Sequence, residues 1–225
     1  MAKSNSSKHN PRIIIVVATC LCQLVLVSCV YNDEPMPKII SNSAENSSID
    51  KLLESNPLNF KQQKPINKNA TNQWLPPSYL EKGWTAIIVH HSGTKNGNVA
   101  IFDKWHREGN HWEGVGYDFV IGNGTNSGDG QVEVTYRWKD QKVGAHCGGT
   151  AGNWANIDAV GICLVGDFNK SRPTSRQLQS LLNLVRFIQS RYHIPKSRIY
   201  GHGDIKATAC PGRNFPMAKL KSMLD

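Results

Sequence analysis

The sequence has no apolar run of the roughly 20 residues that a membrane-spanning helix needs. Its longest apolar stretch, "IIIVVATCLCQLVLV", extends only from Ile13 to Val27. It also has no stripe of arginine and lysine interleaved with aromatic residues, and this absence argues against a nucleic-acid-binding protein. No internal repeat is visible.

Acidic residues are absent from the first 28 positions, whereas Lys3, Lys8 and Arg12 precede the apolar stretch. A basic segment followed by a short apolar one is typical of a secretory signal peptide. The stretch ends in "LVSC", which resembles the bacterial lipobox, where cleavage precedes the cysteine and its sulfur is lipidated. The sequence therefore predicts a lipoprotein signal peptide at residues 1–28 and a lipid anchor on Cys29. An ordinary signal peptide or an uncleaved anchor is the alternative.

The segment after the signal resembles a tether. Residues 29–73 are rich in Asn, Ser, Lys and Pro and contain few large apolar residues. Such a composition predicts a flexible, lipid-anchored segment that holds a domain off the membrane, with room for a short helix around Ile49–Leu53. Val30, instead of Asp, follows Cys29. By resemblance to lipoprotein sorting rules, this residue predicts an outer-membrane location facing the periplasm.

The chain carries a modest basic excess. The formal net charge is +9. Without the three basic residues of the first 28, 23 basic and 17 acidic residues remain, a net charge of +6. Such an excess favours anionic partners such as cell-wall polymer or a membrane surface, although ordinary solubility explains it equally well.

Residues 74–225 carry the strand and helix patterns of a single domain. Apolar β-branched runs predict buried strands in "TAIIVHHS", "VGYDFVIG" and "AVGICLVG", the last of them central, and further strands in "VEVTYRW" and "RIYGH". Helical spacing marks "NVAIFDKWHREG", "LQSLLNLVRFIQSRYH" after a capping box of Thr174 and Gln177, and "FPMAKLKSML". The irregular alternation predicts an α/β fold with a central mixed β-sheet flanked by helices.

Cysteine is scarce in the mature chain. Once the signal is removed and Cys29 is lipidated, Cys147, Cys163 and Cys210 remain. An odd number of thiols in a compartment that permits disulfides indicates that at least one has another task. Whether Cys147 and Cys163 pair is left open, because the sequence does not fix their distance.

Polar residues that bind zinc follow the predicted strands. His90 and His91 end one strand, and His202 ends another in "GHGDIKATACPG", where Cys210 lies just beyond a short loop. Neighbouring residues on a strand point to opposite faces, so one of the two adjacent histidines can face a shared site. Three protein ligands and a water make a catalytic zinc site. Structural histidines and a small buried cysteine are the alternative.

The region from Trp84 to Leu224 resembles the zinc-dependent type 2 N-acetylmuramoyl-L-alanine amidases, a family shared with amidase-type phage lysozymes and peptidoglycan recognition proteins. Four stretches in the family's order carry the resemblance: "IIVHHSGT", "VGYDFVIG", "VGAHCGG" with "NIDAVGICLVGDF", and "GHGDIKATACPG". They cover essentially the whole predicted domain. The resemblance implies one zinc ion per chain, held by His90, His202 and Cys210.

The resemblance also implies roles for other residues. Tyr117 and Thr208 are expected to assist the reaction, and His146 is expected to bind substrate from a loop near the groove. Gly203 stands where many relatives carry Arg, so a supporting salt bridge is in doubt. Asp204 is expected either to orient His202 or to cap a helix. No Glu stands in an obvious general-base position.

The expected function is hydrolysis of the amide bond between N-acetylmuramic acid and L-alanine in peptidoglycan or muropeptides, by a monomer. Two alternatives remain. One is a non-catalytic peptidoglycan-binding lipoprotein, although relatives of that kind typically lose the ligand cysteine. The other is a metal-free hydrolase with Cys210 as nucleophile, in which His90 has no role.

Overall fold

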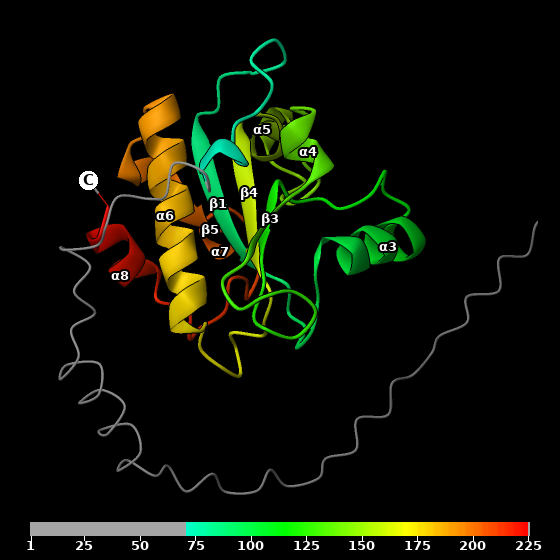
Figure 1. The fold of residues 1–225 in the computed structure, drawn as a ribbon, viewed down its shortest axis with the longest axis vertical. Helices are drawn as coiled ribbons and strands as arrows, with labels where there is room; N and C mark the ends of the chain where they lie inside the picture. The colour runs from blue at the N-terminus through cyan, green and yellow to red at the C-terminus, as the bar shows by residue number, and fades with distance from the viewer. Residues whose placement is uncertain (1–70, 225) are drawn as a thin grey trace, which may run out of the picture. The chain divides into compact units, whose positions relative to one another are not determined.

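A mixed five-stranded sheet forms the centre of the domain (Figure 1). Along the chain the strands are β1 (Ala86–His91), β2 (Phe119–Ile121), β3 (Val132–Val134), β4 (Ala159–Leu164) and β5 (Ile199–Gly201). Their order across the sheet is β3-β2-β4-β1-β5. β1 pairs in parallel with β4 and β5, β2 pairs in parallel with β4, and β3 runs antiparallel to β2. The predicted α/β fold with a mixed sheet is confirmed.

The computed structural model describes residues 71–224. The predicted signal peptide, Cys29, most of the tether and the short helix around Ile49–Leu53 lie outside these residues and stay predictions. Within the described part, no helix is both long and apolar enough to cross a membrane.

The two middle strands are almost completely buried. All six residues of β4 are buried, as are the first five of β1. Strands that are covered on both faces require such continuous apolar runs, because side chains of both orientations leave water. The predicted central position of "AVGICLVG" is therefore confirmed.

Two long helices accompany the sheet. In α3 (Val99–Asn110), the side chain of Asn98 caps the first turn by accepting a hydrogen bond from the Ile101 amide at 2.8 Å. In α6 (Ser175–Tyr192), Thr174 and Gln177 form the predicted capping box. α6 crosses the front of the sheet in the view of Figure 1. It buries an apolar stripe consisting of Leu181, Leu182, Leu184, Val185 and Ile188.

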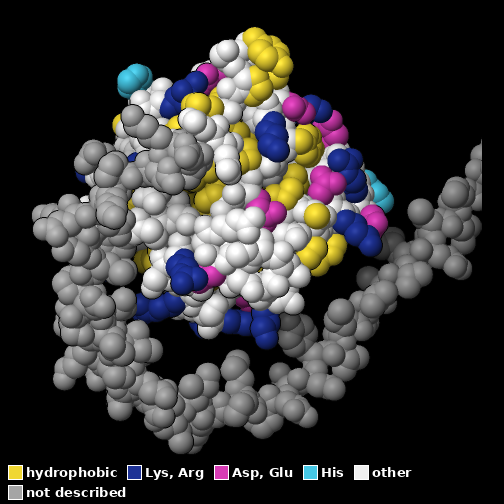
Figure 2. Space-filling model, viewed as in Figure 1, with side chains coloured by type: hydrophobic (Ala, Val, Ile, Leu, Met, Phe, Trp, Pro, Cys, Tyr) yellow, Lys and Arg dark blue, Asp and Glu magenta, His cyan; other side chains and the backbone are white. Residues whose placement is uncertain are grey.

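Short helical turns connect the remaining segments: α4 (Tyr136–Lys139), η2 (Ala151–Asn153), α5 (Trp154–Ile157), η3 (Lys196–Arg198), α7 (His202–Ile205) and α8 (Met217–Ser222). The last corresponds to the helix predicted in "FPMAKLKSML". On the face shown in Figure 2, basic and acidic side chains are interspersed, and apolar side chains appear in several small groups.

The prediction of a strand over "VEVTYRW" is wrong in its second half. β3 stops at Val134, and the hydroxyl of Thr135 then caps α4 by accepting a hydrogen bond from the Arg137 amide at 3.2 Å. The cap offers the backbone an alternative to the sheet ladder. Trp138 completes the turn inside the core, where its indole N–H donates to the carbonyl of Trp74 at 2.7 Å.

The strand predicted over "RIYGH" is one residue too long at each end, because Arg198 still belongs to η3 and β5 begins at Ile199. β5 ends at Gly201, and His202 is the first residue of α7. The Asp204 carboxylate accepts a hydrogen bond from the Gly201 amide at 2.9 Å. Of the two roles considered for Asp204, the structure shows the helix cap.

Candidate metal centre

Three side chains from two distant segments of the chain meet at one edge of the sheet. His90 lies near the end of β1, His202 begins α7, and Cys210 lies in the loop that follows. One ligand atom from each lies within 4.8 Å of the others. The His90 Nδ1 and Cys210 Sγ atoms are 3.7 Å apart. The structure thus brings together the three residues expected to bind zinc.

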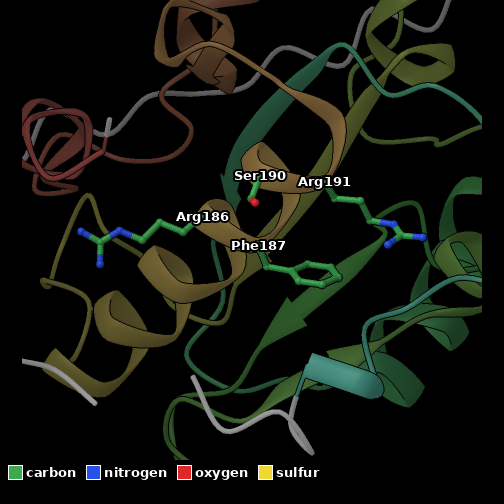
Figure 3. Close-up of a pocket in the computed structure, with 4 residues that line it drawn as sticks. All are labelled: Arg186, Phe187, Ser190 and Arg191. Atoms are coloured by element: carbon green, nitrogen blue, oxygen red, sulfur yellow. The ribbon is translucent and has the colours of Figure 1, made fainter. Parts of the chain in front are cut away.

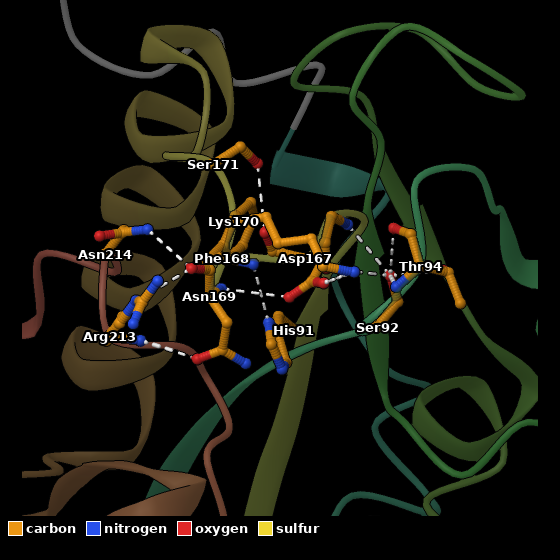
Figure 4. A network of polar contacts seen from close by, with 11 residues as sticks. His91, Ser92, Thr94, Asp167, Phe168, Asn169, Lys170, Ser171, Arg213 and Asn214 are labelled. Atoms are coloured by element: carbon orange, nitrogen blue, oxygen red, sulfur yellow. Dashed lines mark hydrogen bonds and ion pairs between the residues drawn. The ribbon is translucent and has the colours of Figure 1, made fainter. Parts of the chain in front are cut away.

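The strand pleat separates the two adjacent histidines. His90 is 1% exposed and pairs in register with Cys163 of β4. His91 points to the other face, where its Nδ1 accepts a hydrogen bond from the Phe168 amide at 3.0 Å (Figure 4). The rings of His91 and Phe168 pack 5.8 Å apart. His90 therefore faces the cluster, while His91 fixes the loop after β4.

Backbone contacts hold the thiol of Cys210 in place. The amide of His91 donates to its sulfur at 3.3 Å, and the amide of Cys210 donates to the hydroxyl of Thr208 at 3.3 Å. The Gly203 amide donates to the Cys210 carbonyl at 2.7 Å. A Cβ at Gly203 would lie 3.0 Å from the carbonyl oxygens of both Thr208 and Cys210, so this loop is packed closely against the glycine.

The cluster fits a tetrahedral zinc ion. Zinc binds imidazole nitrogen at roughly 2.0–2.1 Å and thiolate at roughly 2.3 Å, which places two such ligands roughly 3.6 Å apart. The distance of 3.7 Å between His90 and Cys210 agrees with this value. Two imidazoles and one thiolate leave a fourth position for water or substrate, as in catalytic sites.

The protonation of the cluster suits metal binding at the histidines. Burial lowers the pKa of His90 well below its usual value and also lowers the pKa of His202, so both rings are neutral and can donate a lone pair. Burial raises the pKa of Cys210 to about 12, although the amide of His91 lowers it. Without a cation the thiol is protonated, and a metal would have to displace that proton.

A cleft opens beside the cluster. It has a volume of about 460 Å³ and is lined by Trp112, Ala145, His146, Gly148, Asn156, His202, Lys206, Ala207 and Thr208. Thr208 is exposed at its rim, whereas His146 is only 7% exposed. Two of the residues expected to act on substrate thus border this cleft, but His146 offers it little surface.

Tyr117 forms another wall of the cluster. Its ring lies 5.3 Å from the ring of His90 and 5.6 Å from that of His106. Burial, followed by the neighbouring thiols of Cys163 and Cys210, raises the pKa of the Tyr117 hydroxyl well above its usual value. The hydroxyl therefore keeps its proton and can act as a hydrogen-bond donor.

Sequence reasoning missed the residues that brace this wall. Arg137 is 4% exposed, and its guanidinium donates to the carbonyls of Val115 and Val143. These contacts tie the segment before Tyr117 to the loop before His146. Nothing in the sequence distinguishes such an arginine from a surface residue, because its partners are backbone carbonyls.

Asn156 and Asp118 were also missed. The Asn156 side-chain oxygen accepts hydrogen bonds from the amides of His146 and Cys147, both at 2.9 Å. Asp118 is fully buried, and one of its oxygens accepts from the Gly161 amide at 2.8 Å. Burial raises the pKa of Asp118 to about 7, although the Gly161 amide lowers it.

The remaining cysteines do not join the cluster. Cys147, Cys163 and Cys210 are all free thiols. Cys147 packs with Ile88 and Ala159, and Cys163 packs in a separate cluster with Phe102 and Val120. The structure contains no disulfide between Cys147 and Cys163 within the part of the chain that it describes.

A second hollow lies on α6 and is lined by Arg186, Phe187, Ser190 and Arg191 (Figure 3). The two guanidinium groups point away from each other. Arg186 donates to the Met223 carbonyl at 2.7 Å, and Arg191 is paired with Glu81. Because both guanidinium groups already have partners, this hollow offers no free charged side chain for a reaction.

The domain matches known proteins in sequence and structure. Residues 81–213 match the family model described as N-acetylmuramoyl-L-alanine amidase. Peptidoglycan-recognition protein SC2 of Drosophila melanogaster is 35% identical over 156 residues, which cover 66% of this chain and 77% of that protein.

Solved structures agree. N-acetylmuramoyl-L-alanine amidase LysC from Clostridium intestinale URNW is 31% identical, with a TM-score of 0.54 over 66% of this chain and 89% of that chain. Peptidoglycan recognition protein-LE, solved with tracheal cytotoxin, is 25% identical, with a TM-score of 0.51 over 72% of this chain and 89% of that chain. The chain belongs to the type 2 N-acetylmuramoyl-L-alanine amidase family, which also contains the peptidoglycan recognition proteins.

Proposed function

We propose that the protein is a zinc-dependent hydrolase that cleaves the amide bond between N-acetylmuramic acid and L-alanine in peptidoglycan or its fragments. The observation that carries the proposal is the grouping of His90, His202 and Cys210, whose ligand atoms lie within 4.8 Å of one another beside an open cleft. The family match and the similarity to LysC support the reaction.

The three ligands would hold one zinc ion per chain. When bound, zinc lowers the pKa of a coordinated water to about 7, which supplies a nucleophile at neutral pH, and it also polarises the carbonyl that is attacked. The residues of the chain add to this chemistry. Tyr117 keeps its proton and can donate a hydrogen bond to the oxygen that becomes negative when the amide is attacked. One such donor is typically worth roughly 2.7–4 kcal/mol.

Thr208 contributes by position. Its hydroxyl accepts a hydrogen bond from the Cys210 amide and lies at the rim of the cleft. A threonine hydroxyl does not remove a proton at neutral pH, so Thr208 would orient the ligand loop or the substrate. Lys206 also lines the cleft and is a cation that a carboxylate of the peptide stem can meet.

The alternatives explain less. A metal-free cysteine hydrolase requires a thiol that ionises readily, with its pKa lowered by its surroundings. Here burial raises the pKa of Cys210, and one of the two histidines that lie beside it would have no role. A non-catalytic binding module needs no complete ligand set, yet all three ligand side chains are present. Peptidoglycan recognition protein-LE, which binds a monomeric peptidoglycan fragment, supports muropeptides as the ligand class in either case.

The decisive experiment treats purified protein with defined muropeptides and reads the products by mass spectrometry. It measures zinc content and activity before chelation, after chelation and after zinc is restored. We expect one zinc per chain and release of the peptide stem only when zinc is present. Cleavage by metal-free protein would establish the cysteine mechanism instead, and binding without cleavage would establish a recognition module.

We further propose that Cys29 anchors the protein by a lipid to the outer membrane, with the domain in the periplasm and acting as a monomer. The support is the sequence alone, "LVSC" after a short apolar stretch. Replacing Cys29→Ala should release the protein into the soluble fraction or block its processing. Unchanged processing and membrane attachment of this variant would exclude the lipid anchor.

A further inference from the structure

His146 lies directly behind one of the expected zinc ligands. Its Nδ1 atom is 3.1 Å from Nε2 of His90, and the two rings meet nearly edge to face at 5.0 Å and 75°. Its Nε2 atom is 3.2 Å from the carbonyl oxygen of Ala159. Both ring nitrogens are therefore engaged within the protein, and the substrate-binding role expected from the sequence stays a prediction.

These two contacts fix where the protons are. A carbonyl oxygen only accepts hydrogen bonds, so Nε2 of His146 must carry a proton and donate it to Ala159. The ring is buried, which favours its neutral form, and Nδ1 is then an acceptor. Nε2 of His90 must in turn donate to it. Nδ1 of His90 is left without a proton, and this is the atom that faces Cys210 at 3.7 Å.

The position of the His146 ring is itself tightly determined. A Cβ at Gly161 would lie 2.4 Å from its Cδ2 atom, and a Cβ at Gly144 would lie 2.6 Å from the same atom. The ring therefore fits a slot that only glycines leave open. The Asn156 side chain holds the backbone of His146 by a hydrogen bond of 2.9 Å. The ring has little freedom to rotate away from His90.

We propose that His146 is a positioning residue that selects the tautomer of His90 with a bare Nδ1 and so prepares this nitrogen for the metal. The inference rests on the proposed zinc function, because it concerns how the chain prepares one of its ligands. Partners of this kind, which hold the second nitrogen of a ligand histidine, fix ring orientation and raise ligand basicity.

The test compares two variants of nearly the same shape. His146→Asn keeps an acceptor close to the position of Nδ1, whereas His146→Leu has the same branching and no acceptor. Nitrogen-15 NMR of the ring of His90 in metal-free protein reports the tautomer, and competition with a chromophoric chelator reports zinc affinity. Thermal unfolding of both variants checks that they are folded.

We expect the wild-type protein to carry the His90 proton on Nε2. His146→Leu should spread the proton over both nitrogens and weaken zinc binding by about 10–100-fold, the usual loss when such a partner is removed. His146→Asn should retain most of the affinity. A proton on Nδ1 of His90 in the wild-type protein overturns the proposal, even if His146→Leu fails to fold.

Equal zinc affinity and an equal tautomer in wild type and folded His146→Leu would overturn it as well. These outcomes are separate from a failure of the proposed function. A protein that binds zinc and shows the expected tautomer but cleaves no muropeptide leaves the inference standing. A protein that cleaves muropeptides but carries the proton on Nδ1 does not.

Discussion

Gly161 offers a way to move the ring of His146 without removing any of its polar atoms. The glycine lies in the middle of β4, and its Cβ, if present, would lie 2.4 Å from Cδ2 and 2.6 Å from Cγ of His146. Ordinary contacts begin at 3.4 Å. In Gly161→Ala the ring must therefore move by about 1 Å, the difference between these two distances.

The magnitude follows from two opposing effects. Overpacking a core costs about 1–3 kcal/mol, and replacing a strand glycine by alanine returns about 0.5–1 kcal/mol of backbone entropy. We expect a net loss of about 1–2 kcal/mol in the free energy of unfolding. A shift of this size also takes the contact of 3.1 Å with His90 beyond hydrogen-bond range. Zinc affinity should then fall by about 10–100-fold.

Chemical denaturation measures the first effect, and chelator competition measures the second. Gly109→Ala is the matched control, because this glycine lies within α3 and a Cβ there meets no atom within 4 Å. The control should gain up to about 1 kcal/mol of stability and keep its zinc affinity. If Gly161→Ala matches the wild type in zinc affinity, the space beside Gly161 does not fix the His146 ring against His90.

Three further outcomes are expected. Tyr117→Phe should keep zinc and lose about 10²–10³-fold in kcat with little change in KM. An equal loss of zinc affinity would show instead that Tyr117 has a structural role at the metal site. Asp118→Asn should remove a pH dependence of stability. The pKa of Asp118 rises to about 7 in the folded protein, so wild-type stability falls as pH increases from about 4 to about 7. Chemical unfolding at pH 5 and pH 8 should show that the variant becomes more stable relative to wild type at the higher pH. The same difference in free energy of unfolding at both pH values would contradict the burial argument. Cys163→Ala should lose roughly 1–2 kcal/mol of stability and keep one zinc per chain, and a lower zinc content would place the thiol at the metal.

The grouping of the expected ligands could be predicted from the sequence for a geometric reason. His90 follows an apolar β-branched run, and His202 follows a shorter one, so both lie at the carboxyl ends of parallel strands. Such ends meet at one edge of a sheet. The two central strands and the capping box of α6 were predictable for similar local reasons, because apolar runs and capping residues act over a few positions.

The features that could not be predicted from the sequence depend on interactions between distant segments. Val132, Val134 and Tyr136 continue a period of two, and only the side-chain cap at Thr135 and the indole contact of Trp138 with Trp74 end the strand early. The engagement of both His146 nitrogens depends in the same way on the Ala159 carbonyl and on a ring of another strand. No pattern within a single segment contains this information.

The separation of the proposed ligands along the chain links metal supply to folding. His90 and Cys210 are 120 positions apart and meet only after β1 and β5 have paired. The unfolded chain can offer the metal little more than the nearby pair His202 and Cys210. Zinc should therefore bind the folded domain far more tightly than the unfolded one, and ligand binding at 1,000 times the dissociation constant adds about 4.1 kcal/mol to stability. For this domain, zinc starvation would lower the folded fraction as well as the activity.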